Sequence, residues 1–213
     1  MKAQAALPAP SCNLCPRLVE FRCQNQKKFP TFFNGAVPGF GGLEASFLIV
    51  GLAPGLKGAN QTGRPFTGDY AGVLLYESLI ESGFAKGAYG AANDDGLILQ
   101  NCRITNAVRC VPPENKPTPE ETHTCGNFLK SEIAAMPNLR AILSLGGVSH
   151  QAVLRAFDKK LSANRFAHGA VHPLTEKITL FDSYHCSRYN TQTKRLTAEM
   201  FKDVIKRIKA FLP

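Results

Sequence analysis

Four short runs of mainly apolar residues have the pattern of strands that are buried on both faces of a parallel sheet. These runs are Phe47–Val50, Arg103–Asn106, Ala141–Leu145 and Ile178–Phe181. The segments that alternate with them have apolar residues at helical spacing and are Tyr70–Ser82, Pro119–Met136, Val148–Phe157 and Ala198–Leu212. This alternation predicts an α/β fold with a central four-stranded parallel sheet, flanked by helices, that binds ligands at the carboxyl ends of its strands.

Length and composition bound the class of protein. With 213 residues, 44% hydrophobic and 19% charged, the chain is expected to form one globular domain over residues 12–213, preceded by a flexible arm over residues 1–11. No apolar run reaches the roughly 18 residues of a membrane-spanning helix, and the N-terminus lacks a signal-peptide pattern. The expected location is the cytoplasm, where the seven cysteines stay reduced or bind metal. A net charge of +9 favours a polyanionic partner, with nucleic acid first.

A glycine-rich loop follows the first expected strand and runs from Gly51 to Asp69. It contains five glycines and two prolines, and such a loop at the end of a buried strand lets the backbone approach a ligand closely. It has no Gly-Lys-Ser or Gly-Lys-Thr sequence, so it is not a phosphate-binding P-loop. Taken alone, the loop fits a ligand site and an ordinary strand-to-helix connection equally well.

Four of the cysteines form the strongest motif. Cys12 and Cys15 make a CxxC pair, and Cys110 and Cys125 form a second pair with 14 residues between them. Two pairs of thiolates can hold a metal centre across a fold, and the second pair is too widely spaced for the knuckle of a zinc ribbon. The spacing favours an iron–sulfur cluster, with unligated thiols as the alternative.

Polar side chains follow two of the expected strands. Asn106 ends one of them, and its amide offers the donor and the acceptor that suit a nucleobase edge, although asparagine is also common in turns. His185 follows the last strand, in a polar and basic loop that suits phosphate contacts. A solvated loop with a surface histidine is the alternative. Ordinary surface residues are expected for His123, His150, His168 and His172.

In combination, these segments resemble the uracil-DNA glycosylase superfamily, and specifically its iron–sulfur branch. The motifs that carry the resemblance match in order and spacing and are Gly51–Gly55, Gly63–Asp69, Ile104–Cys110 and Ser183–Arg188. The resemblance covers nearly the whole chain. Leu52 stands where family-4 enzymes have Glu, and together with the Asn190–Thr197 segment it indicates similarity to family 5, the B-type enzymes. One departure is Cys186, where the usual motif has a proline that stiffens the loop.

The resemblance implies a monofunctional DNA glycosylase that flips out uracil, and other deaminated bases such as hypoxanthine or xanthine, and hydrolyses the N-glycosidic bond. The implied base-binding residues are Leu52, Ala53, Gly55, Phe66 and Asn106, and the implied catalytic residues are Asp69 and His185. The implied DNA-binding residues are Ser187, Arg188, Lys194 and Arg195. A structural [4Fe–4S] cluster would be held by Cys12, Cys15, Cys110 and Cys125. Because Asp69 precedes an expected helix, it could equally be an N-cap.

The implied partner is double-stranded DNA with deaminated bases, and also single-stranded DNA, bound by a monomer in the cytosol of a bacterium or archaeon. Two alternatives stay open at this point. One is an iron–sulfur DNA-binding protein of the same fold that lacks glycosylase activity. The other is a zinc-stabilised nucleotide-binding module. The sequence does not identify the side chain that would wedge into the duplex.

Overall fold

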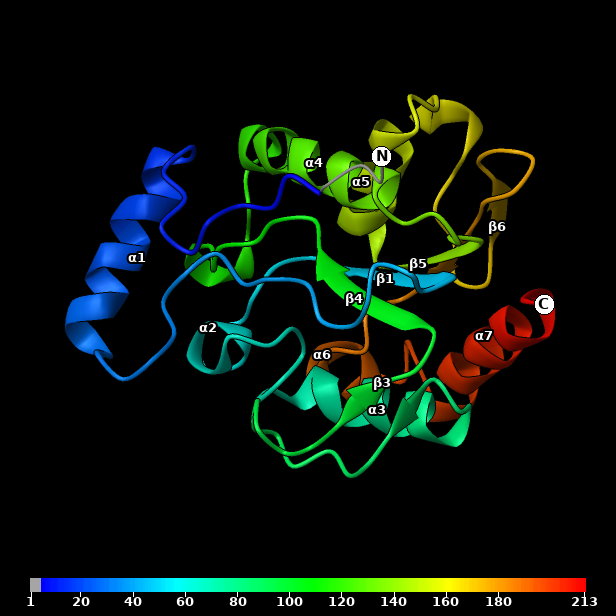
Figure 1. Ribbon diagram of the computed structural model, residues 1–213, viewed down its shortest axis with the longest axis horizontal. Helices are drawn as coiled ribbons and strands as arrows, with labels where there is room; N and C mark the ends of the chain where they lie inside the picture. The colour runs from blue at the N-terminus through cyan, green and yellow to red at the C-terminus, as the bar shows by residue number, and fades with distance from the viewer. Residues whose placement is uncertain (1–4) are drawn as a thin grey trace.

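The computed structural model describes residues 5–213 and has a five-stranded sheet at its centre (Figure 1). Four parallel strands lie in the order β4 (Cys102–Asn106), β1 (Phe47–Gly51), β5 (Ala141–Leu145) and β7 (Thr179–Ser183). They are the four predicted strands, with ends that differ by at most two residues. A fifth strand, β6 (Val171–Pro173), pairs antiparallel with β7 at the sheet edge. Its three residues are too few to show a period of two, and its proline is tolerated only because it lies at an edge.

Helices cover both faces of the sheet (Figure 1). One face packs against α3 (Tyr70–Glu81) and α7 (Ala198–Phe211), and the other packs against α4 (Pro119–Ala134) and α5 (Gly147–Ala156). These are the four predicted helices. The sheet is therefore covered on both sides, as the apolar runs of its strands require.

Alternate residues of each strand belong to different cores. In β1, Phe47 and Ile49 lie in the core with α3 and α7, whereas Leu48 and Val50 lie in the core with α4 and α5. All four side chains are 0% exposed. Because successive strand side chains point to opposite faces, one continuous apolar run supplies both cores.

Three of the long helices begin at side-chain caps. Thr118 and Glu121 form the predicted capping box of α4, with a hydrogen bond in each direction. Asp69 caps α3, and Thr197 caps α7. Because these N-caps fix the residue at which each helix begins, they also set where the preceding loops end.

The sequence did not predict the first helix, α1 (Pro16–Lys28), whose polar residues obscure its periodicity. Residues 5–11 form no helix or strand, but the Ala6 amide donates to Ser131 Oγ at 2.7 Å, and the Pro10 carbonyl accepts from the Ala36 amide at 3.0 Å. Residues 1–4 of the expected arm lie outside the described part.

The short elements are α2 (Ala59–Thr62), β2 (Ala85–Lys86), β3 (Ile98–Leu99), α6 (Arg188–Gln192) and two 3₁₀ turns, Pro113–Asn115 and Leu161–Ala163. The strands β2 and β3 pair with each other in a separate two-stranded sheet. In residues 5–213, no helix has the length and apolar character needed to cross a membrane.

Candidate active site

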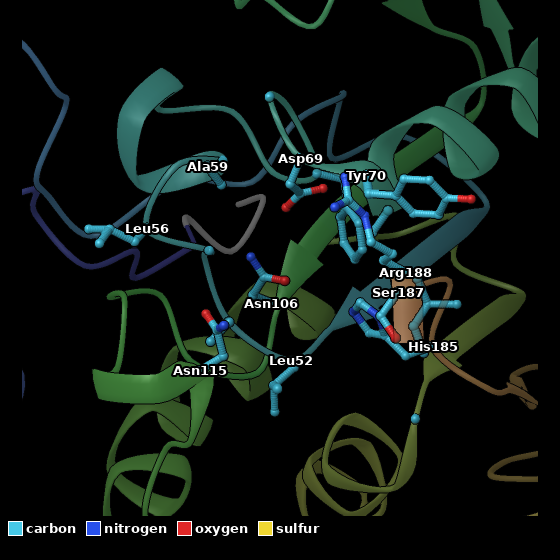
Figure 2. Close-up of a pocket in the computed structure, with 18 of the residues that line it drawn as sticks. Leu52, Leu56, Ala59, Asp69, Tyr70, Asn106, Asn115, His185, Ser187 and Arg188 are labelled. Atoms are coloured by element: carbon cyan, nitrogen blue, oxygen red, sulfur yellow. The ribbon is translucent and has the colours of Figure 1, made fainter. Parts of the chain in front are cut away.

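A cavity of about 800 Å³ opens at the carboxyl ends of β1, β4, β5 and β7. Figure 2 shows Asp69, Asn106 and His185 around the same hollow, although they come from the start of α3, the end of β4 and the segment after β7. The predicted site residues that line this cavity are Leu52, Ala53, Gly55, Phe66, Asp69, Asn106, His185, Ser187 and Arg188. Lys194 and Arg195 do not line it and lie exposed on the segment after α6.

Gly51, the last residue of β1, is buried behind two residues that line the cavity, Asn106 and Phe66. A Cβ atom on Gly51 would lie 2.4 Å from Asn106 Oδ1 and 2.6 Å from Phe66 Cζ, which no real side chain tolerates. The missing side chain therefore lets Asn106 and Phe66 close over the strand end. Phe66 has a φ of 54°, a left-handed backbone conformation that bulky residues rarely adopt. Strained backbone of this kind is often found at functional sites.

Arg64, which the sequence did not single out, anchors the glycine-rich loop. Its guanidinium donates two parallel hydrogen bonds to Asp95, Nη1 to Oδ1 at 2.8 Å and Nη2 to Oδ2 at 2.7 Å, and its Nε donates to Thr67 Oγ1 at 2.7 Å. The hydrogen bonds from Arg64 hold the pKa of Asp95 well below its ordinary value. Tyr76 Oη donates to the Pro65 carbonyl at 2.6 Å. These bonds fix the loop before any ligand binds.

The two carboxylate oxygens of Asp69 have different surroundings: one caps α3 and the other lies against the glycine-rich loop. Oδ1 accepts from the Gly72 amide at 3.1 Å, which shows the helix cap that was the alternative interpretation of Asp69. Oδ2 lies against the loop backbone, because a Cβ atom on Gly58 would be 2.6 Å from it and one on Gly55 would be 3.5 Å from it. Burial raises the pKa of Asp69, and the bonds from the Gly72 and Ala71 amides offset only part of that rise. This carboxylate can hold a water molecule at the cavity.

His185 packs against Phe66, with ring centroids 5.7 Å apart and planes inclined by 27°. Its Nδ1 is buried and has no hydrogen-bond partner among the described residues. Burial lowers the pKa of His185 to about 4, so the ring is neutral at neutral pH. A neutral imidazole can donate one hydrogen bond to negative charge that develops in the cavity.

Residues 188–195, shortly after His185, are mostly exposed and include three basic side chains. Asn190 Nδ2 donates to the His185 carbonyl at 2.8 Å, which ties this segment to His185. The guanidinium of Arg188 lies over the Tyr70 ring, 5.2 Å from its centroid, at the cavity edge. Tyr189, the next residue, is 70% exposed. The sequence did not indicate that Tyr189 would be exposed, because its exposure depends on how α6 packs against the rest of the protein.

Several cavity residues were missed by sequence reasoning. Lys57, Tyr70 and Asn115 line the cavity, as does the Gly146–Val148 segment at the start of α5. The paired glycines of that segment were a usable signal, since Gly146 has a φ of 100°, a backbone conformation that favours glycine.

Three of the histidines expected at the surface depart from that expectation. His168 is only partly exposed and packs against the Tyr184 ring, with ring centroids 5.2 Å apart. His150 is 2% exposed, so its interpretation as a surface residue is wrong. His172 is only partly exposed and contacts the same carboxylate as His150, that of Asp182. The sequence does not reveal this shared partner because the three residues come from different elements.

The four predicted metal-binding cysteines lie together beside α1. Cys12 and Cys15 precede this helix, Cys110 follows β4 and Cys125 lies on α4, and all four line one small apolar hollow. Burial, followed by the neighbouring cysteines, raises the pKa of Cys110 to about 12, and burial raises that of Cys125 to about 11. These thiols therefore ionise only when a cation offsets their charge. Four soft sulfur donors in a closed hollow fit a metal centre.

Comparison with known proteins identifies relatives over most of the chain. Residues 38–209 match the family model of the Uracil DNA glycosylase superfamily. The chain is 45% identical to the type-5 uracil-DNA glycosylase of Thermus thermophilus over 200 residues, which cover 92% of this chain and 91% of the relative. It is 36% identical to the type-5 enzyme of Pyrobaculum aerophilum over 204 residues, 94% of this chain and 88% of that one. Identity to the type-4 uracil-DNA glycosylase of Archaeoglobus fulgidus is 32% over 154 residues, 70% of this chain and 69% of that one.

Proposed function

The chain belongs to the uracil-DNA glycosylase superfamily and is a DNA repair glycosylase, and from this premise we propose how its cavity excises uracil. The observation that carries the proposal is the convergence of Asp69, Asn106 and His185 on one cavity that also contains the Phe66 ring. An aromatic face, an amide, a neutral imidazole and a carboxylate are the groups that this reaction requires.

The substrate base must leave the helix before it can reach this cavity. Phe66 stacks on the flipped base, because its buried ring presents a fixed apolar face. The Asn106 amide hydrogen-bonds the Watson–Crick edge of the base, since it offers one donor group and one acceptor. Asn106 is 3% exposed, so little rotational freedom is lost when the base binds.

Cleavage breaks the bond between the sugar C1′ atom and the base nitrogen. The bonding electron pair leaves with uracil, and the backbone amides of Leu52–Gly55 and the neutral His185 ring stabilise the resulting anion. Asp69 stabilises the positive charge that develops on the sugar and orients water toward C1′. The water oxygen bonds to C1′ and its proton passes to the Asp69 carboxylate, whose raised pKa suits a proton acceptor.

The exposed segment after His185 holds the DNA. Ser187, Arg188, Lys194 and Arg195 contact phosphates, because a hydroxyl and three exposed cations can approach the backbone from one side. Tyr189, 70% exposed beside the cavity, enters the space that the flipped base leaves in the stack. This assigns the wedge that the sequence alone did not identify.

The cavity volume supports a wider choice of base. A cavity of about 800 Å³ is ample for a purine. In the Gly51–Gly55 motif, the residues that line it include apolar Leu52 and Ala53 and no carboxylate. We therefore propose that hypoxanthine and xanthine are also excised, from double-stranded and single-stranded DNA.

A base-release panel tests this range of substrates. Under single-turnover conditions, duplexes with uracil, hypoxanthine, xanthine or ethenocytosine should show release of uracil and of at least one deaminated purine. Release of uracil alone would contradict the wider range. Release of no base from any duplex would favour a DNA-binding protein without glycosylase activity.

The four cysteines are proposed to hold a [4Fe–4S] cluster. When bound, this group supplies covalent cross-links between the segments that carry its ligands, and hydrolysis of a glycosidic bond needs no electron transfer from it. Cys12 and Cys15 would tie the start of α1 to Cys110 after β4 and to Cys125 on α4. The role is therefore structural.

Metal analysis and absorbance test the cluster. The purified protein should be brown, with broad absorption near roughly 400 nm and about four irons per chain. Cys110→Ala should lose the colour and much of the soluble protein, whereas Cys23→Ala, an exposed cysteine outside the hollow, should keep both. A colourless protein with one zinc per chain would contradict the assignment.

We also propose that the protein acts as a monomer in the cytoplasm. The cavity is complete within one chain, because every proposed base-binding and catalytic residue comes from it. Sedimentation of the protein with and without a short uracil duplex tests this, and a stable dimer in either sample would contradict it.

A further inference from the structure

A buried cluster outside the cavity joins α5 to β5, β6 and β7. Its centre is the carboxylate of Asp182, which is 0% exposed. Oδ1 lies 2.9 Å from His150 Nδ1 and accepts from Ser144 Oγ at 2.6 Å, while Oδ2 lies 3.0 Å from His172 Nε2. The proposed reaction uses none of these four side chains.

His150 faces an acceptor at each of its ring nitrogens. Nε2 lies 2.8 Å from the Asn164 carbonyl oxygen, and Nδ1 lies 2.9 Å from the Asp182 carboxylate. A backbone carbonyl only accepts, so Nε2 must carry a hydrogen. A neutral imidazole has only one N–H. If that N–H is at Nε2, the lone pair of Nδ1 points toward a carboxylate oxygen, which is repulsive. A positive species must therefore lie between Nδ1 and Oδ1, and a proton is the smallest that fits.

The proton belongs to the imidazole and not to the carboxyl group. Ser144 and His172 also direct donors at the Asp182 carboxylate, and hydrogen bonds to a carboxylate favour its charged form. Burial alone would lower the pKa of His150, but the hydrogen bond and charge of Asp182 raise it above the ordinary value. The ionisable side chains that face His150 are Asp182 from β7 and His172 from β6.

We propose that His150 is a buried imidazolium, paired with the Asp182 carboxylate, and that this ion pair positions the cavity wall at Gly146–Val148. The His150 amide donates to the Gly146 carbonyl at 3.0 Å, and the Gly146 amide donates to the Ser183 carbonyl at 2.9 Å. The pair thus clamps the first turn of α5 to the end of β7, two residues before His185. The charge state stands independently, whereas the effect on catalysis rests on the proposed function.

Nitrogen NMR of the holoprotein tests the charge state directly. In a long-range ¹H–¹⁵N spectrum at about pH 7.5, roughly a unit above the ordinary imidazole pKa, both His150 nitrogens should show protonated-type shifts. His123, exposed on α4, is the internal reference in the same spectrum. One protonated and one unprotonated nitrogen on His150 would overturn the proposal. So would one zinc per chain, beyond the iron, that Asp182→Asn abolishes, because a metal ion would then occupy the gap.

Single-turnover kinetics on a uracil duplex test the positioning role. His150→Gln and Asp182→Asn should each lower the cleavage rate by about tenfold with duplex affinity unchanged, and the double variant should be no slower than either single one, because both lose the same pair. The parent rate should fall at alkaline pH as the imidazolium loses its proton, and Asp182→Asn should lack that fall. Unchanged rates in both single variants would overturn the role, while a parent protein that releases no uracil would overturn the proposed function and leave the NMR result standing.

Discussion

The two sides of the cavity are built in different ways. The side formed by the glycine-rich loop and the start of α3 is buried or partly buried at most positions, and the Arg64–Asp95 pair and the Asp69 cap fix it. The side formed by α6 and the residues after it is more exposed, and its basic residues Arg188 and Arg195 lie over the rings of Tyr70 and Tyr184. Groups that act on a bond must be held to a fraction of an ångström, whereas groups that hold DNA need only reach it. The first side should therefore govern the rate of cleavage, and the second should govern affinity and its response to salt.

Loss of His185 should have the largest effect on rate. His185→Ala removes the donor to the departing anion, and loss of one such donor lowers the rate by about 10²- to 10³-fold. Single-turnover cleavage of a uracil duplex measures this, with binding of uncleaved duplex as the check that affinity is retained. His123→Ala, on the exposed face of α4, is the matched control. Cleavage by His185→Ala at the parent rate would remove this residue from the mechanism.

The pH profile separates Asp69 from His185. Burial raises the pKa of Asp69, so the active carboxylate is lost at a higher pH than for an ordinary aspartic acid, and the rate should fall about tenfold per unit below that pKa. His185, with a pKa lowered to about 4, stays neutral over the same range. The acid limb should therefore persist in His185→Ala. An inflection near the ordinary imidazole pKa that disappears in this variant would contradict the assignment.

Tyr189 should affect duplex substrates more than single strands. Tyr189→Ala removes the proposed wedge and should slow cleavage of paired uracil by about tenfold, since unstacking costs a few kcal/mol. Cleavage in single-stranded DNA should change little, because no stack has to be opened. Ile98→Ala is the control, as Ile98 is 65% exposed on β3, away from the cavity. An equal loss on both substrates would mean that Tyr189 supports the fold of α6 and is not a wedge.

Removal of single phosphate contacts should have the smallest effect. Lys194→Ala and Arg195→Ala should each weaken duplex binding a few-fold and reduce the slope of log affinity against log salt by roughly 0.9. The choice of base should not change. Lys130→Ala is the control, because Lys130 pairs with Asp158 on the far helix layer. A changed base preference with an unchanged slope would place these residues at the lesion instead.

How much the sequence could predict depends on whether the signal is local. The apolar runs located all four parallel strands, and the residue types of Thr118 and Asp69 indicated possible helix caps. Strand runs and helix caps both depend on residues that are close in the sequence. The Arg64–Asp95 pair, 31 residues apart, and the His150–Asp182 pair, 32 apart, have no local signature. The exposure of Tyr189 and the position of β6 likewise depend on tertiary packing. The resemblance placed Asn106, Phe66 and His185 at one site, which periodicity alone could not do.

Asp69→Asn tests the central claim most directly, because asparagine caps a helix about as well as aspartate and isolates the charge. The fold and the affinity for uncleaved duplex should be retained, and the thermal midpoint should not fall, because a carboxylate whose pKa burial raises disfavours the folded state at neutral pH. Single-turnover release of uracil should slow by about 10²-fold or more. Release at the parent rate, from a variant that binds duplex normally, would show that the Asp69 carboxylate is only a helix cap and would contradict the proposed mechanism.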